Sequence, residues 1–310
     1  MNVQSISRAA APLRGVFAAM VTPMTADEEI DLAKLAEATD RLIRHGVHGL
    51  VPLGSTGEYY ALSADERERV LRTTLEAAAG RVPVIAGTNA GSTREVIAYS
   101  QQAEQLGCAG IMLAAPYYSL PGPEELFAHF KAVNDAIGVP IIVYNYPGRT
   151  GVDMTPALLE RLAELQNVRY VKESTGEMSR ITELLRRCGD RLGVFCGCDT
   201  IALESLMMGA IGWIGGVANV LPASHTTLYE LAVERSEYGA ARTLFFEMLP
   251  VLELMEGGGK YTQWVKAACG LMGCDCGPPR RPLGPATAAE LADLREALLQ
   301  TAEGRRAMMP

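Results

Sequence analysis

Long apolar runs are missing from this chain of 310 residues. A helix that crosses a membrane needs roughly 18–20 consecutive apolar residues, and no run reaches that length, so we expect no membrane partner. Residues 1–14 contain two arginines and no acidic residue, but they lack the apolar core of a secretory signal. We predict that residues 1–14 form a flexible N-terminal tail.

Basic residues are also too few to favour a nucleic acid as a partner. The chain has 28 lysines and arginines against 36 acidic residues, which gives a formal net charge of −8 at pH 7. The pairs Arg280-Arg281 and Arg305-Arg306 are isolated, and no dense basic run exists. A negative surface repels phosphate backbones and anionic lipids.

A disulfide framework and a zinc site are both disfavoured by the cysteines. Their number is seven, which is odd, and their spacing matches no framework, so we expect reduced thiols in a cytosolic protein. One residue separates Cys196 from Cys198, and one separates Cys274 from Cys276, which is not the usual spacing of structural zinc ligands. None of the four histidines lies near them in sequence. We therefore predict no bound metal.

What the chain does have is a series of short apolar runs, with enough hydrophobic residues (48%) for a substantial core. The runs are too short for helices and rich in β-branched residues, which predicts buried strands. They cover residues 16–22, 49–53, 82–87, 110–115, 140–145, 168–173, 192–196 and 212–217. Segments with helical periodicity lie between them. Two begin with recognisable caps: Ser63 with Glu66 three residues later, and Thr155 followed by Pro156.

A strand followed by a helix, eight times, predicts a (β/α)8 (TIM) barrel over residues 15–225. An open doubly wound sheet is the alternative, but no Gly-x-Gly-x-x-Gly follows the first strand. After residue 225 the pattern changes to helices alone, at 228–238, 240–253, 261–270 and 287–301. We predict that residues 226–310 form a helical extension packed on the barrel, because no linker separates them from it.

The run 168–173 contains a lysine, Lys172, where a buried strand is expected to end. A buried ammonium is costly unless it is paired or neutral. Lys172 could therefore reach the surface or pair with Glu173. Alternatively, burial could keep its amine partly neutral, so that the amine attacks a carbonyl and forms a Schiff base. Taken alone, the residue favours the first explanation.

Polar residues at other strand ends favour the second explanation, because active sites of such barrels lie at the carboxyl ends of the strands. Ser55 and Thr56, between glycines, can hold a carboxylate, although a plain polar turn explains them equally well. Tyr144 can transfer protons and Arg149 can bind a carboxylate through two hydrogen bonds; tyrosines that pack on a barrel rim are common. Together these residues predict a pocket that converts the carbonyl of an α-keto acid to an imine.

With these motifs, the chain resembles the dihydrodipicolinate synthase / N-acetylneuraminate lyase family of class I aldolases, from about Gly15 to Leu299. The motifs are Gly54-Ser-Thr-Gly-Glu58, Tyr144-Asn-x-Pro147, Lys172-Glu173 and the Gly-Gly-x-Ala-Asn run that ends at Asn219. The resemblance implies that Lys172 forms the Schiff base with pyruvate and that Tyr144 transfers protons. It implies no metal or organic cofactor, because the lysine itself supplies the electron sink.

The resemblance also assigns the other pocket residues. Ser55 and Thr56 would bind the keto-acid carboxylate, with Ser55 linking Tyr144 to Tyr118. In this family the residue matching Tyr118 usually reaches into the active site of a neighbouring subunit, which implies a homodimer or homotetramer. Residues that match backbone positions lining the pocket are Gly197 and Ile214.

The particular reaction is less well defined. Arg149 matches the arginine that binds the second substrate's carboxylate in the synthases, and the sialic-acid lyases generally lack it. Ser55, however, stands where the synthases typically have threonine. Tyr59 and Tyr60 replace small residues of the lysine-inhibited synthases, and Gly91 replaces an asparagine, so we expect no inhibition by lysine.

Three hypotheses for the function therefore remain: a synthase, a catabolic enzyme and a sensor without activity. A lysine-insensitive synthase and a catabolic relative, acting on a sugar-derived keto acid or on a pyrroline carboxylate, both fit these residues. Within the same imine chemistry the reaction could be cleavage, dehydration or deamination. A pyruvate-binding sensor without activity is disfavoured, because a sensor does not need an activated amine.

Overall fold

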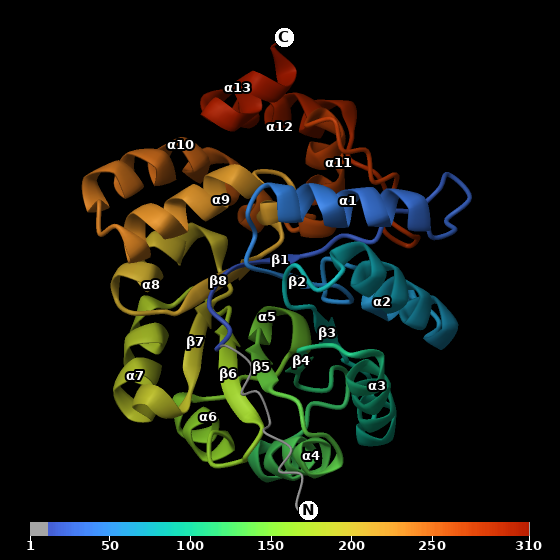
Figure 1. The fold of residues 1–310 in the computed structure, drawn as a ribbon, viewed down its shortest axis with the longest axis vertical. Helices are drawn as coiled ribbons and strands as arrows, with labels where there is room; N and C mark the ends of the chain where they lie inside the picture. The colour runs from blue at the N-terminus through green and yellow to red at the C-terminus, as the bar shows by residue number, and fades with distance from the viewer. Residues whose placement is uncertain (1–11, 310) are drawn as a thin grey trace, which may run out of the picture.

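The computed structural model describes residues 12–309, and eight parallel strands form its centre (Figure 1). The strands are β1 (Gly15–Ala19), β2 (Gly49–Val51), β3 (Ile85–Gly87), β4 (Gly110–Ala114), β5 (Ile141–Asn145), β6 (Val168–Glu173), β7 (Gly193–Cys196) and β8 (Gly212–Gly215). They pair in the order β2-β1-β8-β7-β6-β5-β4-β3, and a parallel bridge between Leu50 and Val84 brings the two ends together. This confirms the predicted (β/α)8 barrel and excludes the open sheet.

Helices follow each strand and surround the barrel. They are α1 (Leu32–Arg44), α2 (Ala64–Ala78), α3 (Thr93–Leu106), α4 (Pro123–Ala136), α6 (Pro156–Leu162), α7 (Met178–Cys188), α8 (Ala202–Met207) and α9 (Pro222–Tyr229), with a short additional helix, α5 (Pro147–Thr150), after β5. The predicted capping box is confirmed, since Glu66 N–H donates to Ser63 Oγ (3.3 Å) and Ser63 N–H to the Glu66 carboxylate (2.8 Å). Thr155 caps α6, with Pro156 at its first position.

Several strands are shorter than predicted, for reasons visible in the sequence. β2 ends at Val51 because Pro52 has no N–H to donate, and Leu53 then adopts a left-handed backbone conformation (φ 60°). The apolar residues beyond the strand ends are still buried, as Leu53 is. An apolar pattern reports burial, whereas a strand boundary depends on hydrogen bonding.

Side chains on alternate strand positions form two separate cores. One lies between the strands and the helices. The other fills the barrel interior and consists of Leu13, Phe17, Ala19, Val51, Ile85, Met112, Ala114, Ile142, Tyr144, Phe195 and Ile214. Tyr170 packs against the interior core, so Lys172, two residues further along β6, also points inward, whereas Glu173 does not.

The predicted N-terminal tail is only partly described, because residues 1–11 lie outside the described residues. Leu13 is buried in the interior core, and its N–H donates to the Tyr170 hydroxyl (3.0 Å). The three described residues of that segment thus lie against the amino end of the barrel.

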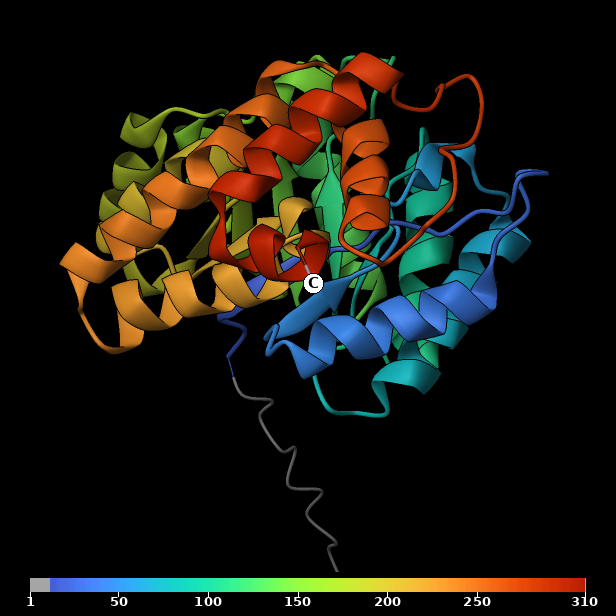
Figure 2. The ribbon, with the colours of Figure 1, turned by 90° about the horizontal axis from the view of Figure 1, so that it is seen from above.

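Four further helices follow, α10 (Tyr238–Gly257), α11 (Tyr261–Leu271), α12 (Ala288–Gln300) and α13 (Ala302–Met308). The predicted helix at 228–238 exists with other bounds: α9 begins earlier, at Pro222, and passes into a π-helical turn that ends at Glu234. In Figure 2, α10 and α12 lie side by side, with α11 beside them. α10 contacts the 3-10 helix after β7, η3 (Asp199–Ile201), and α11 contacts the one after β8, η4 (Val217–Asn219). Within residues 12–309, no helix combines the length and apolar character needed to cross a membrane.

Candidate active site

A cavity of 210 Å³ opens at the carboxyl ends of the strands. Seven of the residues predicted from the sequence line it: Ser55, Thr56, Tyr144, Arg149, Lys172, Gly197 and Ile214. They come from five different strand ends, so the barrel topology alone brings them together. Tyr118 is the predicted site residue that does not line this cavity.

Lys172 is buried in this cavity without an acidic partner. Its side chain sits on β6 opposite Tyr144 of β5, and Nζ lies 4.2 Å from the centre of the Tyr144 ring. The residue is 6% exposed, and none of the ion pairs found among residues 12–309 includes it. Glu173 instead accepts hydrogen bonds from Asn145 Nδ2 (3.0 Å) and Thr175 N–H (2.8 Å). A surface lysine, or one paired with Glu173, is therefore excluded.

Burial lowers the pKa of the Lys172 amine to about 8. The negative charge of Asp199 opposes this change most strongly, followed by Tyr146, Cys196 and Glu256. An ordinary lysine is almost entirely protonated at neutral pH. Lys172, in contrast, carries a substantial neutral fraction near pH 8, and the neutral form is the nucleophile.

Tyr144 lies beside Lys172 and keeps its phenolic proton. Burial raises the pKa of Tyr144 to about 12, against the opposing effects of Arg149 and of the Ser55 and Ser174 hydroxyls. A phenol in this state can donate a proton to a reacting oxygen and take it back.

Ser55 and Thr56 occupy a tight turn after β2. The turn is closed by Gly57 N–H to Gly54 O (3.0 Å) and Glu58 N–H to Ser55 O (3.2 Å). Neither Ser55 N–H nor Thr56 N–H donates to a backbone oxygen of the described chain. Because both residues line the cavity, these groups are free to bind an anion there.

Arg149 reaches the cavity from α5, which begins with Pro147 and which the sequence analysis did not predict. Its positive charge lowers the pKa of Tyr144 and of Tyr146, although burial raises both overall. Tyr146, which the sequence analysis also missed, lies 6.0 Å from Tyr144 between ring centres. This side of the cavity is therefore suited to a second anionic group.

The C-terminal helices contribute residues that the sequence analysis missed altogether. Glu256 of α10 and Tyr261 of α11 line the cavity together with Thr262. Tyr261 accepts from Gly216 N–H (2.9 Å) and donates to Asp199 Oδ2 (2.5 Å), which joins α11 to β7 and β8. Residues 257–259 are three glycines between two predicted helices, and this was the one available signal for a sharp turn at the site.

Asp199 is a buried carboxylate behind the cavity. Trp213 Nε1 donates to its Oδ1 (2.8 Å), while its own N–H donates to Glu256 (2.5 Å). Burial, and next the charge of Glu256, raise the pKa of Asp199 well above its usual range. Among residues 12–309 no set of three histidine, cysteine or acidic side chains is placed to hold a metal ion. All seven cysteines are free thiols.

Tyr118 lies in the loop between β4 and α4, on the outside of the molecule. It is 95% exposed and has a left-handed backbone conformation (φ 71°). Nearby, the rings of Tyr59 and Tyr117 lie 6.5 Å apart, and those of Tyr59 and Tyr60 5.6 Å apart. The structure thus places Tyr118 on the surface and outside the cavity.

A (β/α)8 barrel with a buried lysine and polar strand ends is the architecture of a barrel enzyme. The chain belongs to the dihydrodipicolinate synthetase family, whose model matches residues 12–301. It is 40% identical to the 4-hydroxy-tetrahydrodipicolinate synthase of Citrifermentans bemidjiense and 38% identical to that of Pelobacter propionicus, each over 281 residues, 91% of this chain and 96% of the relative.

Solved structures agree with the sequence relatives. The chloride-inhibited dihydrodipicolinate synthase from Acinetobacter baumannii, solved in complex with pyruvate, superposes with a TM-score of 0.89 at 33% identity, covering 93% of this chain and 99% of that one. These findings confirm the predicted family and the predicted enzyme class, a lyase.

Proposed function

We propose that this lyase is a Schiff-base (class I) aldolase that acts on pyruvate or another 2-keto acid. The observation that carries the proposal is Lys172, a buried amine that lies in a cavity without an ion-pair partner among the described residues. A buried amine of this kind costs stability. Its position beside a phenol and opposite an anion-binding turn gives it a chemical use.

The proposed reaction begins with Lys172 Nζ attacking the C2 carbonyl of the keto acid. The carbonyl oxygen leaves as water: Tyr144 passes to it the two protons that the amine loses, and one further proton from solvent leaves the imine protonated. The resulting protonated imine accepts electrons from the adjacent carbon, so that carbon can lose a proton or a C–C bond can break. In the proposed proton relay Ser55 connects Tyr144 to the Tyr118 that a neighbouring subunit would contribute, and Ser174 offers a second hydroxyl near the phenol.

The keto-acid carboxylate is proposed to bind at the turn that carries Ser55 and Thr56. Two free N–H groups and two hydroxyls there can surround one carboxylate. Backbone atoms of Gly197 and Ile214 complete the wall on β7 and β8. A Cβ atom at Gly197 would lie 2.7 Å from Lys172 Cε and 2.0 Å from Ser174 Oγ, so glycine is required for the lysine to lie there.

The second substrate or product is proposed to carry a carboxylate, which Arg149 binds. The curated relatives are 4-hydroxy-tetrahydrodipicolinate synthases, so a reaction of that kind is the first candidate. Ser55, Tyr59 and Tyr60 support a second candidate, an aldolase or dehydratase of 2-keto-3-deoxy sugar acids or a deaminase of a pyrroline carboxylate. Assays of pyruvate with aldehydes, and of keto-deoxy acids alone, distinguish condensation, cleavage and dehydration.

An oligomer is proposed on the basis of Tyr118. Tyr118 lies in a loop, has a left-handed backbone conformation and is 95% exposed. Its side chain can therefore enter the site of a neighbouring subunit, and a homodimer is the smallest complete unit. No inhibition by lysine is proposed, because Tyr59 and Tyr60 stand where the lysine-inhibited synthases have small residues.

Borohydride reduction tests the central proposal. With pyruvate present, we expect a stable adduct whose mass equals reduced pyruvate bound to one lysine, mapped by peptide mass spectrometry to Lys172. Without pyruvate, borohydride should leave the protein unmodified and active. A wild-type enzyme that gives no adduct, or gives it at another lysine, would contradict the proposal.

Replacing Arg149 by alanine should weaken the reaction with the second substrate but not adduct formation with pyruvate. We expect the pyruvate adduct to form as before, while kcat/KM for a carboxylate-bearing second substrate falls by about 10–100-fold, since a bidentate charged contact contributes about 1.5–3 kcal/mol. Steady-state kinetics with second substrates that have and lack the distal carboxylate measure this. An equal loss for both kinds would show that Arg149 does not bind that carboxylate.

A further inference from the structure

A buried ion pair connects the substrate-binding turn to the C-terminal helices. Glu58 Oε1, at the end of the turn 54–58, lies 2.6 Å from Lys266 Nζ of α11, and the two side chains are 0% and 1% exposed. The other oxygen, Oε2, accepts from Arg280 N–H (2.8 Å), while Lys266 Nζ also donates to Pro278 O (2.9 Å). Both oxygens of Glu58 are therefore bound by the C-terminal extension.

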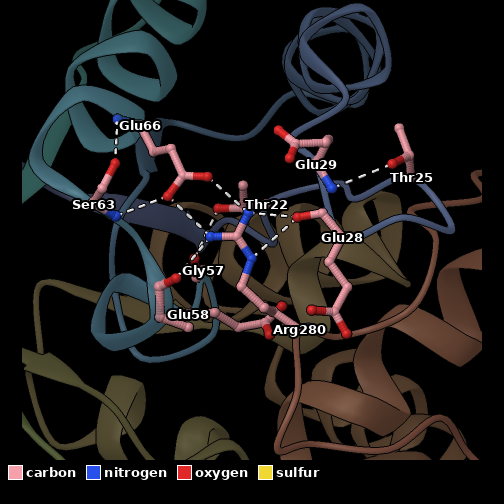
Figure 3. A network of polar contacts seen from close by, with 10 residues as sticks. Thr22, Thr25, Glu28, Glu29, Gly57, Glu58, Ser63, Glu66 and Arg280 are labelled. Atoms are coloured by element: carbon pink, nitrogen blue, oxygen red, sulfur yellow. Dashed lines mark hydrogen bonds and ion pairs between the residues drawn. The ribbon is translucent and has the colours of Figure 1, made fainter.

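The Arg280 side chain extends this connection to the neighbouring loops (Figure 3). Its guanidinium binds both carboxylate oxygens of Glu66, at 2.7 and 2.9 Å, at the first turn of α2. It also donates to Ala61 O (2.7 Å) and to Glu28 O (3.1 Å from Nε). One side chain thus joins the segment before α12 to the loops that follow β1 and β2.

The backbone of the turn needs such support. Leu53, just before the turn, and Glu58, its last residue, have φ values of 60° and 58°. Residues other than glycine adopt this conformation at a cost in energy. Strained residues of this kind persist only where the surrounding structure fixes them. On one side Thr22 Oγ1 donates to Gly57 O (2.8 Å), and on the other the C-terminal extension binds Glu58.

A buried ion pair adds little to stability compared with apolar residues of the same shape. The contacts of this pair favour a role in positioning, because Lys266 and Arg280 N–H bind the two oxygens of the residue that ends the turn. We propose that Lys266, with Glu58 and Arg280, positions Ser55 and Thr56 so that their N–H and hydroxyl groups surround the keto-acid carboxylate. The C-terminal extension then acts on substrate binding without touching the substrate at these residues. This inference rests on the proposed function, in which that turn binds the carboxylate.

The test measures how borohydride trapping at Lys172 depends on pyruvate concentration. For Lys266→Met we expect the half-saturating pyruvate concentration and KM to rise about 10–100-fold, because small displacements of binding groups have effects of this size, while trapping at saturating pyruvate and kcat stay within about threefold of wild type. Lys34→Met is the matched control: it breaks the Lys34–Asp275 pair (2.8 Å), which also joins barrel to extension but touches no residue of the turn. Its KM for pyruvate should not change.

Two further variants keep the test decisive if Lys266→Met does not fold. Glu58→Gln/Lys266→Met removes both buried charges together and should raise KM for pyruvate as Lys266→Met does. Arg280→Gln keeps the Arg280 N–H on Glu58 and removes only the guanidinium bonds to Ala61 O, Glu28 O and Glu66 behind the turn, so its KM should rise less, and Arg280→Lys should restore part of that loss. Unchanged pyruvate dependence in these variants, with only a lower melting temperature, would overturn the inference. A wild-type enzyme without any adduct would instead overturn the proposed function.

Discussion

Replacing Lys172 by alanine is expected to abolish turnover and the borohydride adduct together. In the proposed mechanism the lysine supplies the covalent electron sink, so its loss should lower kcat by more than the roughly 10²–10⁴-fold that a single acid–base group contributes. No other amine lines the cavity among the residues the structure describes. Steady-state assays with pyruvate, and mass spectrometry after reduction, measure the two effects.

Lys172→Met is the control for the fold. Methionine fills a similar volume without a buried amine, and removing an unpaired buried amine relieves a desolvation cost, so the melting temperature should stay the same or rise. Thermal unfolding followed by circular dichroism measures this. Residual activity in Lys172→Ala, or a large loss of stability in Lys172→Met, would show that the residue is structural.

The barrel could be predicted from the sequence because its strands are buried on both faces. Each strand is then a short, nearly continuous apolar run, and a polar residue at its end stands out, as Lys172 does. The chemistry of Lys172 did not follow from its own segment, since the choice between ion pair and nucleophile depends on what surrounds it. Tyr144, 28 positions earlier, lies opposite it only through strand register.

Residues from the C-terminal helices could not be predicted because helix docking leaves no local pattern. Glu256 and Tyr261 are separated by a glycine turn, and a Cβ atom at Gly258 would lie 1.9 Å from the Trp264 ring. This turn directs both side chains to the cavity, but only the three-dimensional structure shows this. Lys266 has the same difficulty: within its helix nothing marks it as the partner of Glu58, which lies 208 positions earlier in the sequence.

The extension is thus part of the candidate active site and not only a cover for the barrel. It lines the cavity with Glu256, Tyr261 and Thr262, and it binds Glu58 from behind. Strand ends supply the proposed reacting groups, and the extension contacts the turn that carries Ser55 and Thr56, through Glu58, and the carboxylate of Asp199. Changes in the extension are therefore expected to alter substrate affinity even where they leave Lys172 untouched.

Replacing Tyr144 by phenylalanine is expected to lower kcat by about 10²–10⁴-fold, the contribution of one positioned proton donor and acceptor. The ring remains in the interior core, so the fold should persist, and the adduct with Lys172 should still form at long incubation times. Its rate of formation should fall, because the leaving oxygen no longer receives a proton from the phenol. Stopped-flow or quenched trapping measures that rate.

The pH dependence separates the role of Tyr144 from that of Lys172. Since only the neutral amine attacks and its pKa is lowered to about 8, kcat/KM of the wild type should rise about tenfold per pH unit below 8 and level off above it. In Tyr144→Phe this rise should remain near the same pH, because burial, the main cause of the lowered pKa, is unchanged, while the plateau drops. If kcat/KM of Tyr144→Phe no longer rises with pH, the titrating group is Tyr144. If its plateau equals that of the wild type, Tyr144 takes no part in the proton transfer.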